Sequence, residues 1–168
     1  MDARETVDRE TAERDRIGIR PATPADVQRI ASLIMLGAPK QTMTAAEIAA
    51  EAGHPAYAEA FREILASPGN TLFVAERDGA VVGTFQVTLI PGLVARGRKR
   101  AKIESVHVAP ECRGLGIGAI MMAHALAFAA ERGAGLAELT SNKDRPDAHR
   151  FYRRLGFEQS HEGFKKQL

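Results

Sequence analysis

The stretch VAPECRGLGIGAIMM, from Val108 to Met122, decides which fold this chain adopts. Gly114, Gly116 and Gly118 follow Arg113, and an apolar run with helical spacing begins directly behind them. Glycine has no Cβ, so it accepts unusual backbone conformations and lets a ligand approach the main chain. The unpaired N–H groups and the positive dipole end of a helix N-terminus attract anions, and an arginine adds a permanent positive charge. The stretch therefore predicts a phosphate-binding loop at the beginning of a helix.

The composition limits the class of protein. The chain has 168 residues, of which 45% are hydrophobic, and this suits one globular domain with a sizeable core. Its formal net charge of +2 is too small to indicate nucleic acid or an anionic membrane as the main partner. The single cysteine, Cys112, excludes an intrachain disulfide and favours a reducing compartment. With no apolar run near the roughly 20 residues needed to span a bilayer, and no secretory signal at the N-terminus, we expect a cytoplasmic protein.

The sequence predicts a tail followed by a single domain. Residues 1–15 mix acidic and basic side chains with almost no large apolar ones, so we expect a mobile charged tail before a domain over residues 16–168. In the first half of the domain we expect a short strand at Ile17 and Ile19, and then a helix that Thr23 or Asp26 caps. Next come a helical region over about 45–65 that is interrupted at 53–55, and a β-hairpin that turns at 77–79.

The second half alternates strands and helices. We expect a strand ending before Pro110, a helix from the glycines to Gly133, a strand over 135–141, a helix over 145–155, and a closing strand or hairpin over 156–168. This order indicates one mixed α/β domain with both antiparallel and parallel strand pairs.

Alternative phosphate-binding motifs fit the glycine loop less well. A Walker A loop needs a lysine followed by serine or threonine, and the loop has neither. A dinucleotide-binding fingerprint is satisfied locally by Gly114, Gly116 and Ala119, with Glu138 as the downstream acid. However, only residues 139–168 follow that acid, and a hairpin precedes the loop where a doubly wound sheet needs βα units. A helix start that is merely rich in glycine is the remaining alternative.

Two segments together resemble the GNAT superfamily of acetyltransferases. The segment VHVAPECRGLGIGAIMM resembles the acyl-CoA signature, in which a Val-x-Val-x-Pro strand end precedes (Arg/Gln)-x-x-Gly-x-(Gly/Ala), matched by Arg113, Gly116 and Gly118. The segment TSNKDRPDAHRFYRRLGFEQS resembles the later motif of the family, with its Phe-Tyr-x-x-Leu-Gly-Phe ending. The resemblance extends from about Ile17 to the C-terminus and is strong after Glu104. It implies a GNAT-like α/β fold, with a mostly antiparallel central sheet, flanking helices and two splayed parallel strands.

The resemblance also implies a cosubstrate and its contacts. In the family the loop amides hold the pyrophosphate of acetyl-CoA, and the pantetheine arm lies between two splayed strands, here 103–108 and 136–141; no metal is implied. The cofactor-binding residues that we expect on this basis are Val106, His107, Val108, Arg113, Gly114, Leu115, Gly116, Ile117, Gly118, Ala119, Asn142, His149 and Tyr152.

Tyr152 is the expected general acid. Acyl transfer to an amine needs a neutral amine, stabilisation of the developing oxyanion and a proton for the departing thiolate. In the resemblance Tyr152 occupies the position of the tyrosine near the CoA sulfur, and an unperturbed tyrosine pKa of about 10 is close enough to the roughly 8.5 of a thiol for this transfer. The alternative is that Tyr152 only packs its helix onto the sheet.

Glu104 is the expected base, acting through a water molecule. Regular strand alternation places Glu104 and His107 on opposite faces, so they are not expected to face the same pocket. A purely structural ion pair with Lys102 or Arg100 is the alternative for this carboxylate. His107 and His54 are the other candidate bases. An acyl-enzyme on Cys112 is less favoured, because this cysteine precedes the phosphate loop and lies far from the thioester. The basic run RGRKR, residues 96–100, either receives the 3′-phosphate of CoA or an acidic acceptor, or is simply solvated.

These observations predict a single-domain N-acetyltransferase. It would move the acetyl group from acetyl-CoA to a primary amine, on a small molecule or a peptide, by direct transfer in a ternary complex; a homodimer is compatible with this hypothesis. The alternative is a CoA-binding sensor or regulatory module on the same fold without turnover. Neither charge nor motif identifies the amine.

Overall fold

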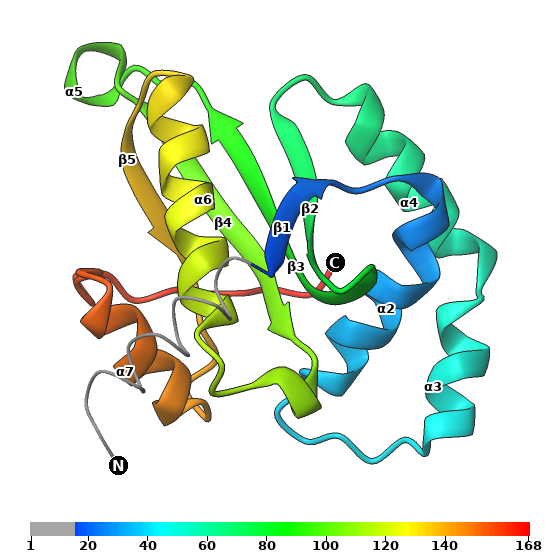
Figure 1. Ribbon diagram of the computed structural model, residues 1–168. Helices are drawn as coiled ribbons and strands as arrows, with labels where there is room; N and C mark the ends of the chain where they lie inside the picture. The colour runs from blue at the N-terminus through cyan, green and yellow to red at the C-terminus, as the bar shows by residue number, and fades with distance from the viewer. Residues whose placement is uncertain (1–15) are drawn as a thin grey trace.

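The computed structural model describes residues 16–168, so the tail expected over residues 1–15 lies outside the described residues. The elements in chain order are β1 (Ile17–Pro21), the 3-10 helix η1 (Pro24–Asp26), α2 (Val27–Leu36), α3 (Ala45–Ala52), α4 (Pro55–Ala66), β2 (Asn70–Arg77), β3 (Ala80–Ile90), α5 (Val94–Gly97), β4 (Lys99–Val108), η2 (Pro110–Cys112), α6 (Ile117–Glu131), β5 (Ala134–Leu139) and α7 (Pro146–Arg154) (Figure 1).

The five strands form one sheet in the order of the chain, β1-β2-β3-β4-β5. The pairs from β1 to β4 are antiparallel, whereas β4 and β5 are parallel and are connected through α6. The hairpin between β2 and β3 turns at Asp78 and Gly79, whose φ angles of 51° and 79° are those of a two-residue type I′ turn. The mixed α/β class and the hairpin predicted from the sequence are therefore confirmed.

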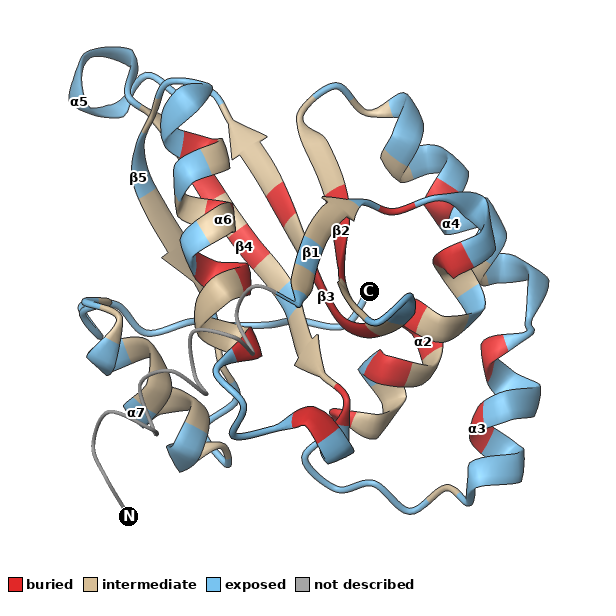
Figure 2. Cartoon of the chain, in the orientation of Figure 1, coloured by how far each residue is buried: buried red, intermediate tan, exposed pale blue. Residues whose placement is uncertain are grey.

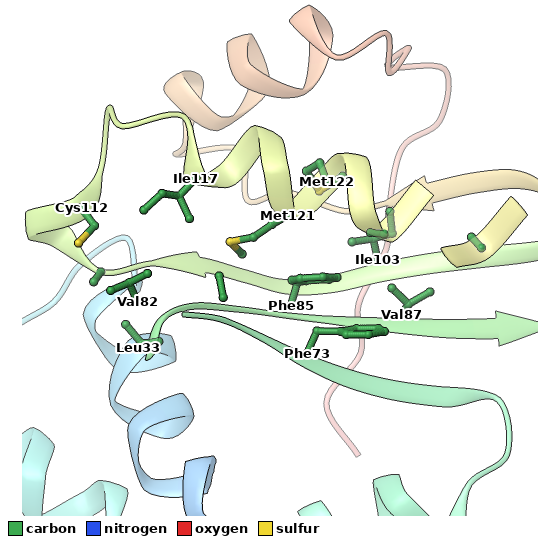
Figure 3. Packing of buried hydrophobic residues seen from close by; sticks show 14 of the residues in the cluster. Leu33, Phe73, Val82, Phe85, Val87, Ile103, Cys112, Ile117, Met121 and Met122 are labelled. Carbon is green, nitrogen blue, oxygen red and sulfur yellow. The ribbon is translucent and has the colours of Figure 1, made fainter. Parts of the chain in front are cut away.

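Helices cover both faces of the sheet. Neighbouring residues of a strand point to opposite faces, and in β2 Phe73 joins the cluster that includes Met121 of α6, whereas Val74 packs with Ile30 of α2 and Phe61 of α4. Buried residues accordingly gather where α6 meets the sheet and where α2 and α4 meet it (Figure 2). The larger cluster, on the side of α6, is filled by the labelled aromatic, aliphatic and methionine side chains of Figure 3.

The beginning of the domain is fixed by a polar network. The backbone N and the Oγ1 of Thr23 donate to Asp26 Oδ2 at 2.7 and 2.8 Å, and Arg20 pairs with the same carboxylate at 2.7 Å. The hydrogen bond from Arg20 is the main reason why the pKa of Asp26 falls to about 2. Of the two expected capping residues, Thr23 is the N-cap of η1, and Asp26 accepts from its backbone N. Asp26 is the N-cap of α2 but forms no side-chain cap hydrogen bond with that helix. The helical region that follows divides into α3 and α4 at residues 53–54, close to the expected interruption.

The closing strand or hairpin expected over 156–168 is wrong. Residues 157–168 contain no strand, residues 158–168 are exposed, and the Phe164 side chain is 92% exposed. A strand added to a sheet with a covered face must bury alternate side chains, and this polar segment offers too few apolar ones in alternation. In the described part of the chain, β5 is therefore an edge strand. No helix within residues 16–168 is long and apolar enough to cross a membrane.

Candidate active site

A cleft opens where the two parallel strands separate. β4 and β5 pair from Lys99 opposite Ala134 to Ile103 opposite Leu139, where β5 ends while β4 continues to Val108. The cleft has a volume of about 100 Å³ and is lined by Ile103, Glu104, Ser105, Val106, His107, Thr140, Ser141, Asn142, Arg145 and Tyr152. It lies where the family resemblance places the pantetheine arm.

A β-bulge in β4 aims two candidate residues at the same face. Gln86 lies opposite Glu104 and Thr84 lies opposite His107, so two residues of β4, Ser105 and Val106, are accommodated opposite one residue of β3. Ser105 has a φ of +52°, which is unusual for a residue with a Cβ. The expectation that Glu104 and His107 point to opposite faces is therefore wrong, because the extra residue cancels the alternation.

The glycine loop has the geometry of an anion site. Gly114 and Gly116 have φ angles of +80° and +78°, in the left-handed region, and no neighbouring atom lies within 4 Å of where a Cβ would be. The loop therefore needs these glycines for backbone conformation rather than for packing. The first N–H groups of α6, at Ile117 and Gly118, have no carbonyl partner within the helix. These residues fit a bound pyrophosphate.

Gly118 is needed for close packing rather than for its backbone conformation. Its φ is not in the left-handed region, but a Cβ there would lie 3.3 Å from the Phe151 ring of α7. Lacking that Cβ, Gly118 lets α7 pack closely against the first turn of α6. Since Tyr152 follows Phe151, this contact also fixes the general-acid candidate relative to the phosphate loop.

Arg113 joins two parts of the site. Its Nε donates to Val108 O at 3.2 Å, and its Nη2 donates to Leu36 O at 3.3 Å. The guanidinium therefore holds the C-terminal end of α2 against the end of β4. Its positive charge also complements the negative end of the α2 dipole.

Tyr152 lies partly buried in the cleft. Its ring packs between Phe151 and Phe157, with centroid distances of 5.2 and 6.0 Å. Burial raises the pKa of the hydroxyl, while the positive charge of Arg145 acts in the opposite direction. The phenol therefore keeps its proton near neutral pH, as a general acid must.

Glu104 forms the ion pair considered for it and also lines the cleft, as a candidate base must. Its Oε1 is 2.9 Å from Lys102 Nζ, so the structural ion pair is present, and the same residue lines the cleft. Neighbours two apart in a strand share a face, so the lysine accompanies the carboxylate at the edge of the cleft. The pair places a carboxylate within the site without burying an unpaired charge.

His107 is held as a neutral ring. Its Nδ1 is buried and has no hydrogen-bond partner among residues 16–168. Burial, followed by the positive charges of Arg145 and Arg113, lowers the pKa of His107 to about 4. The ring packs directly against Gly37, the residue that ends α2. Within the described part of the chain the buried Nδ1 has no partner to which a proton could pass, whereas the Glu104 side chain is 39% exposed at the cleft, so Glu104 remains the candidate base.

The other histidine candidates have structural partners. His54 precedes α4, and its Nδ1 accepts a hydrogen bond from Ala56 N at 3.2 Å. His149 Nε2 is 2.9 Å from Asn142 O, and Asn142 Oδ1 accepts from Asp144 N at 2.9 Å. Both contacts organise the loop that leads into α7.

The remaining predicted residues lie along the same path. Val106 lines the cleft, Val108 ends β4, Leu115 is exposed in the loop and Ala119 belongs to the first turn of α6. Cys112, by contrast, is buried in the core (Figure 3) and is not among the residues that line the cleft.

The basic run lies at the opposite end of β4 from the phosphate loop. Arg100 forms two contacts with Glu138, at 2.9 and 3.0 Å, and Lys99 Nζ donates to Arg132 O at 2.7 Å. A ten-residue strand is about 30 Å long. These side chains therefore fix the start of β4 against β5 and the end of α6.

Five residues that line the cleft were not among the predicted site residues, namely Ile103, Ser105, Thr140, Ser141 and Arg145. Arg145 directly precedes α7 and lies seven positions before Tyr152, and this position was the signal that could have identified it. No cluster of side chains suited to hold a metal ion occurs within residues 16–168.

The glycine loop begins α6, and the cleft between the splayed parallel strands is lined by the partly buried Tyr152. This arrangement is typical of an acyltransferase. Residues 40–157 match the Acetyltransferase (GNAT) family, and because this range covers more than half of the chain, the chain belongs to that family.

Individual proteins resemble this chain in sequence or in fold. The aminoalkylphosphonate N-acetyltransferase of Salmonella typhimurium is 36% identical over 118 residues, which are 70% of this chain and 76% of that protein. The crystal structure of a transcriptional regulator from Bacillus halodurans C-125 is 37% identical, with a TM-score of 0.80 over 90% of this chain and 99% of that one. A predicted acetyltransferase with acetyl-CoA from Clostridium acetobutylicum is 20% identical, with a TM-score of 0.67 over 90% of this chain and 96% of that one, and this likeness concerns the fold alone.

Proposed function

We propose that this protein transfers the acetyl group of acetyl-CoA directly to a primary amine, within a ternary complex. The observation that carries the proposal is the connection between the phosphate loop and the cleft. The Gly118–Phe151 contact fixes Tyr152 at a set position relative to the amides at the start of α6. A cosubstrate held by its pyrophosphate is thereby aligned with the proton donor, and alignment of this kind is a large part of catalysis.

In this proposal Glu104 accepts a proton from the amine and Tyr152 donates a proton to the leaving thiolate. Glu104, through a water molecule, removes a proton from the amine so that its lone pair can attack the thioester carbonyl. The C–N bond forms, the C–S bond breaks, and Tyr152 gives its proton to the departing thiolate. The acylated nitrogen then loses its second proton, which restores the phenol through solvent, and the carboxylate releases to solvent the proton that it took first.

The acceptor is a primary amine on a small molecule or a peptide. The name of the Salmonella relative, an aminoalkylphosphonate N-acetyltransferase, favours small amines as the first class to test. The name of the Bacillus relative, a transcriptional regulator, favours the second candidate function, a CoA-binding regulatory module without turnover.

One experiment separates the two candidates. CoA release from acetyl-CoA is followed with a thiol reagent in the presence of a panel of primary amines, and CoA binding is measured by titration calorimetry on the same preparation. The enzyme predicts amine-dependent release and a matching acetylated amine by mass spectrometry. Tight CoA binding without release for any amine would instead support the regulatory module.

A further inference from the structure

Arg145 is a cation in the cleft without a counter-charge. Its side chain is partly buried, and within residues 16–168 its guanidinium forms neither an ion pair nor a hydrogen bond. The neighbouring acid Asp147 pairs with Arg150, and Glu104 on the opposite wall pairs with Lys102. Charges that lose part of their hydration are normally paired, so an unpaired one in a cleft indicates a ligand.

The position of Arg145 strengthens this argument. The residue directly precedes α7, so its positive charge lies at the positive end of that helix dipole. Such a placement is unfavourable in the protein by itself and becomes favourable when an anion is bound between them. Arg145 lines the cleft together with Tyr152 and His107. Its positive charge opposes the burial that raises the pKa of Tyr152 and adds to the burial that lowers the pKa of His107.

The anion that Arg145 is placed to bind is not the pyrophosphate of CoA. The phosphate loop, residues 113–118, contributes no residue to the lining of the cleft, whereas Tyr152 and Arg145 line it together. The anion beside Arg145 therefore lies near the thioester end of the cosubstrate.

We infer that Arg145 binds an acidic group of the acceptor, and that the acceptor is a short primary amine carrying a phosphonate or carboxylate a few bonds from its nitrogen. This inference rests on the proposed acetyltransferase function. The attacking nitrogen must come within about 3–3.5 Å of the thioester carbonyl. The pantetheine arm is expected in the same cleft of about 100 Å³, so an acceptor that reaches both Tyr152 and Arg145 must have a short spacer between its nitrogen and its acid.

The test uses three acceptors with the same two-carbon spacer, namely 2-aminoethylphosphonate, β-alanine and ethanolamine. The wild type should acetylate at least one acidic amine with a kcat/KM at least tenfold above that for ethanolamine. Arg145→Gln should lower kcat/KM at least tenfold for the acidic amines but less than threefold for ethanolamine. Arg145→Lys should recover part of this loss. Lys143→Gln, which removes one exposed positive charge from the same loop, is the matched control and should change none of the ratios.

Binding provides a second readout that does not depend on turnover. Each acidic amine is titrated into wild type and Arg145→Gln that have been saturated with CoA, and binding should occur in the wild type and be lost in the variant. A loss that is equal for all three amines, or one confined to the KM for acetyl-CoA, would assign Arg145 to cosubstrate binding and overturn the inference. Turnover of ethanolamine at the rate of the acidic amines would overturn it while leaving the proposed function intact. If no amine is turned over, the proposed function fails, and the titration alone decides whether Arg145 binds an acidic amine.

Discussion

Gly37→Ala should destabilise the protein only because His107 lies against it. Gly37 has φ −88° and ψ −1°, a conformation that alanine adopts without strain. In open space such a replacement stabilises a protein by about 0.4–1 kcal/mol, by restricting the unfolded chain. Here, however, the new Cβ would lie 1.9 Å from His107 Nδ1 and 2.6 Å from Cε1. An ordinary contact begins at 3.4 Å, so the ring would have to move by about 1.5 Å.

The size of the effect follows from overpacking. Forcing extra atoms into a packed site costs about 1–3 kcal/mol, so we expect Gly37→Ala to lower the free energy of unfolding by about 1–2 kcal/mol. In a His107→Ala background the same change should be neutral or stabilising by up to about 1 kcal/mol. The difference is a coupling energy of about 2 kcal/mol.

The assay is urea unfolding of the four proteins of the cycle, followed by circular dichroism. Gly92→Ala is the matched control, because a Cβ at Gly92 meets no atom within 4 Å; it should have the same small effect in both backgrounds. If Gly37→Ala costs the same with and without His107, the close approach of α2 to the imidazole is not what requires glycine, and the reasoning is refuted.

Three further predictions concern the loop, the acid and the pH dependence of stability. Gly116→Val should weaken CoA binding at least tenfold, about 1.4 kcal/mol, since a β-branched residue resists the φ of +78°. The affinity is measured by calorimetry on a variant that circular dichroism shows to be folded, and an unchanged affinity would contradict the prediction. Tyr152→Phe should lower kcat by roughly 100-fold with little change in the KM for acetyl-CoA, and near wild-type turnover would make Tyr152 a packing residue. Folding lowers the pKa of His107 from 6.5 to about 4, so between these values the unfolded chain binds the proton more readily. The contribution of the neutral ring to the free energy of unfolding is therefore complete above about pH 6.5 and is lost as the pH falls, and the loss reaches about 3 kcal/mol near pH 4. Urea unfolding of wild type and His107→Gln over this range should show a free energy of unfolding that depends less steeply on pH in the variant. Equal slopes would exclude the effect.

Local signals predicted most of the fold. The hairpin turn at 78–79, the glycine loop before α6 and the interruption between α3 and α4 each depend on the backbone preferences of a few neighbouring residues, which a sequence displays directly. The closing strand failed because pairing depends on what the rest of the sheet can cover, and residues 157–168 supply no apolar face of their own.

The site was harder to predict because its geometry depends on contacts distant in sequence. The bulge at Ser105 is set by the pairing of β3 with β4, and alternation alone could not show that Glu104 and His107 share a face. Arg145 is conspicuous only once the fold brings Glu104 of β4 to the same cleft and the partners of Glu104 and Asp147 are known.

The sheet order has a consequence for how the protein matures during folding. β2, β3 and β4 follow one another through short connections, so this meander can pair with little loss of loop entropy. The parallel pair of β4 and β5 forms only after residues 109–133, including all of α6, have been closed into a loop. Non-local closures of this kind slow folding, and the cleft is made of that pair. We therefore expect the ability to bind CoA to be among the last properties acquired in refolding, after most of the antiparallel sheet has formed.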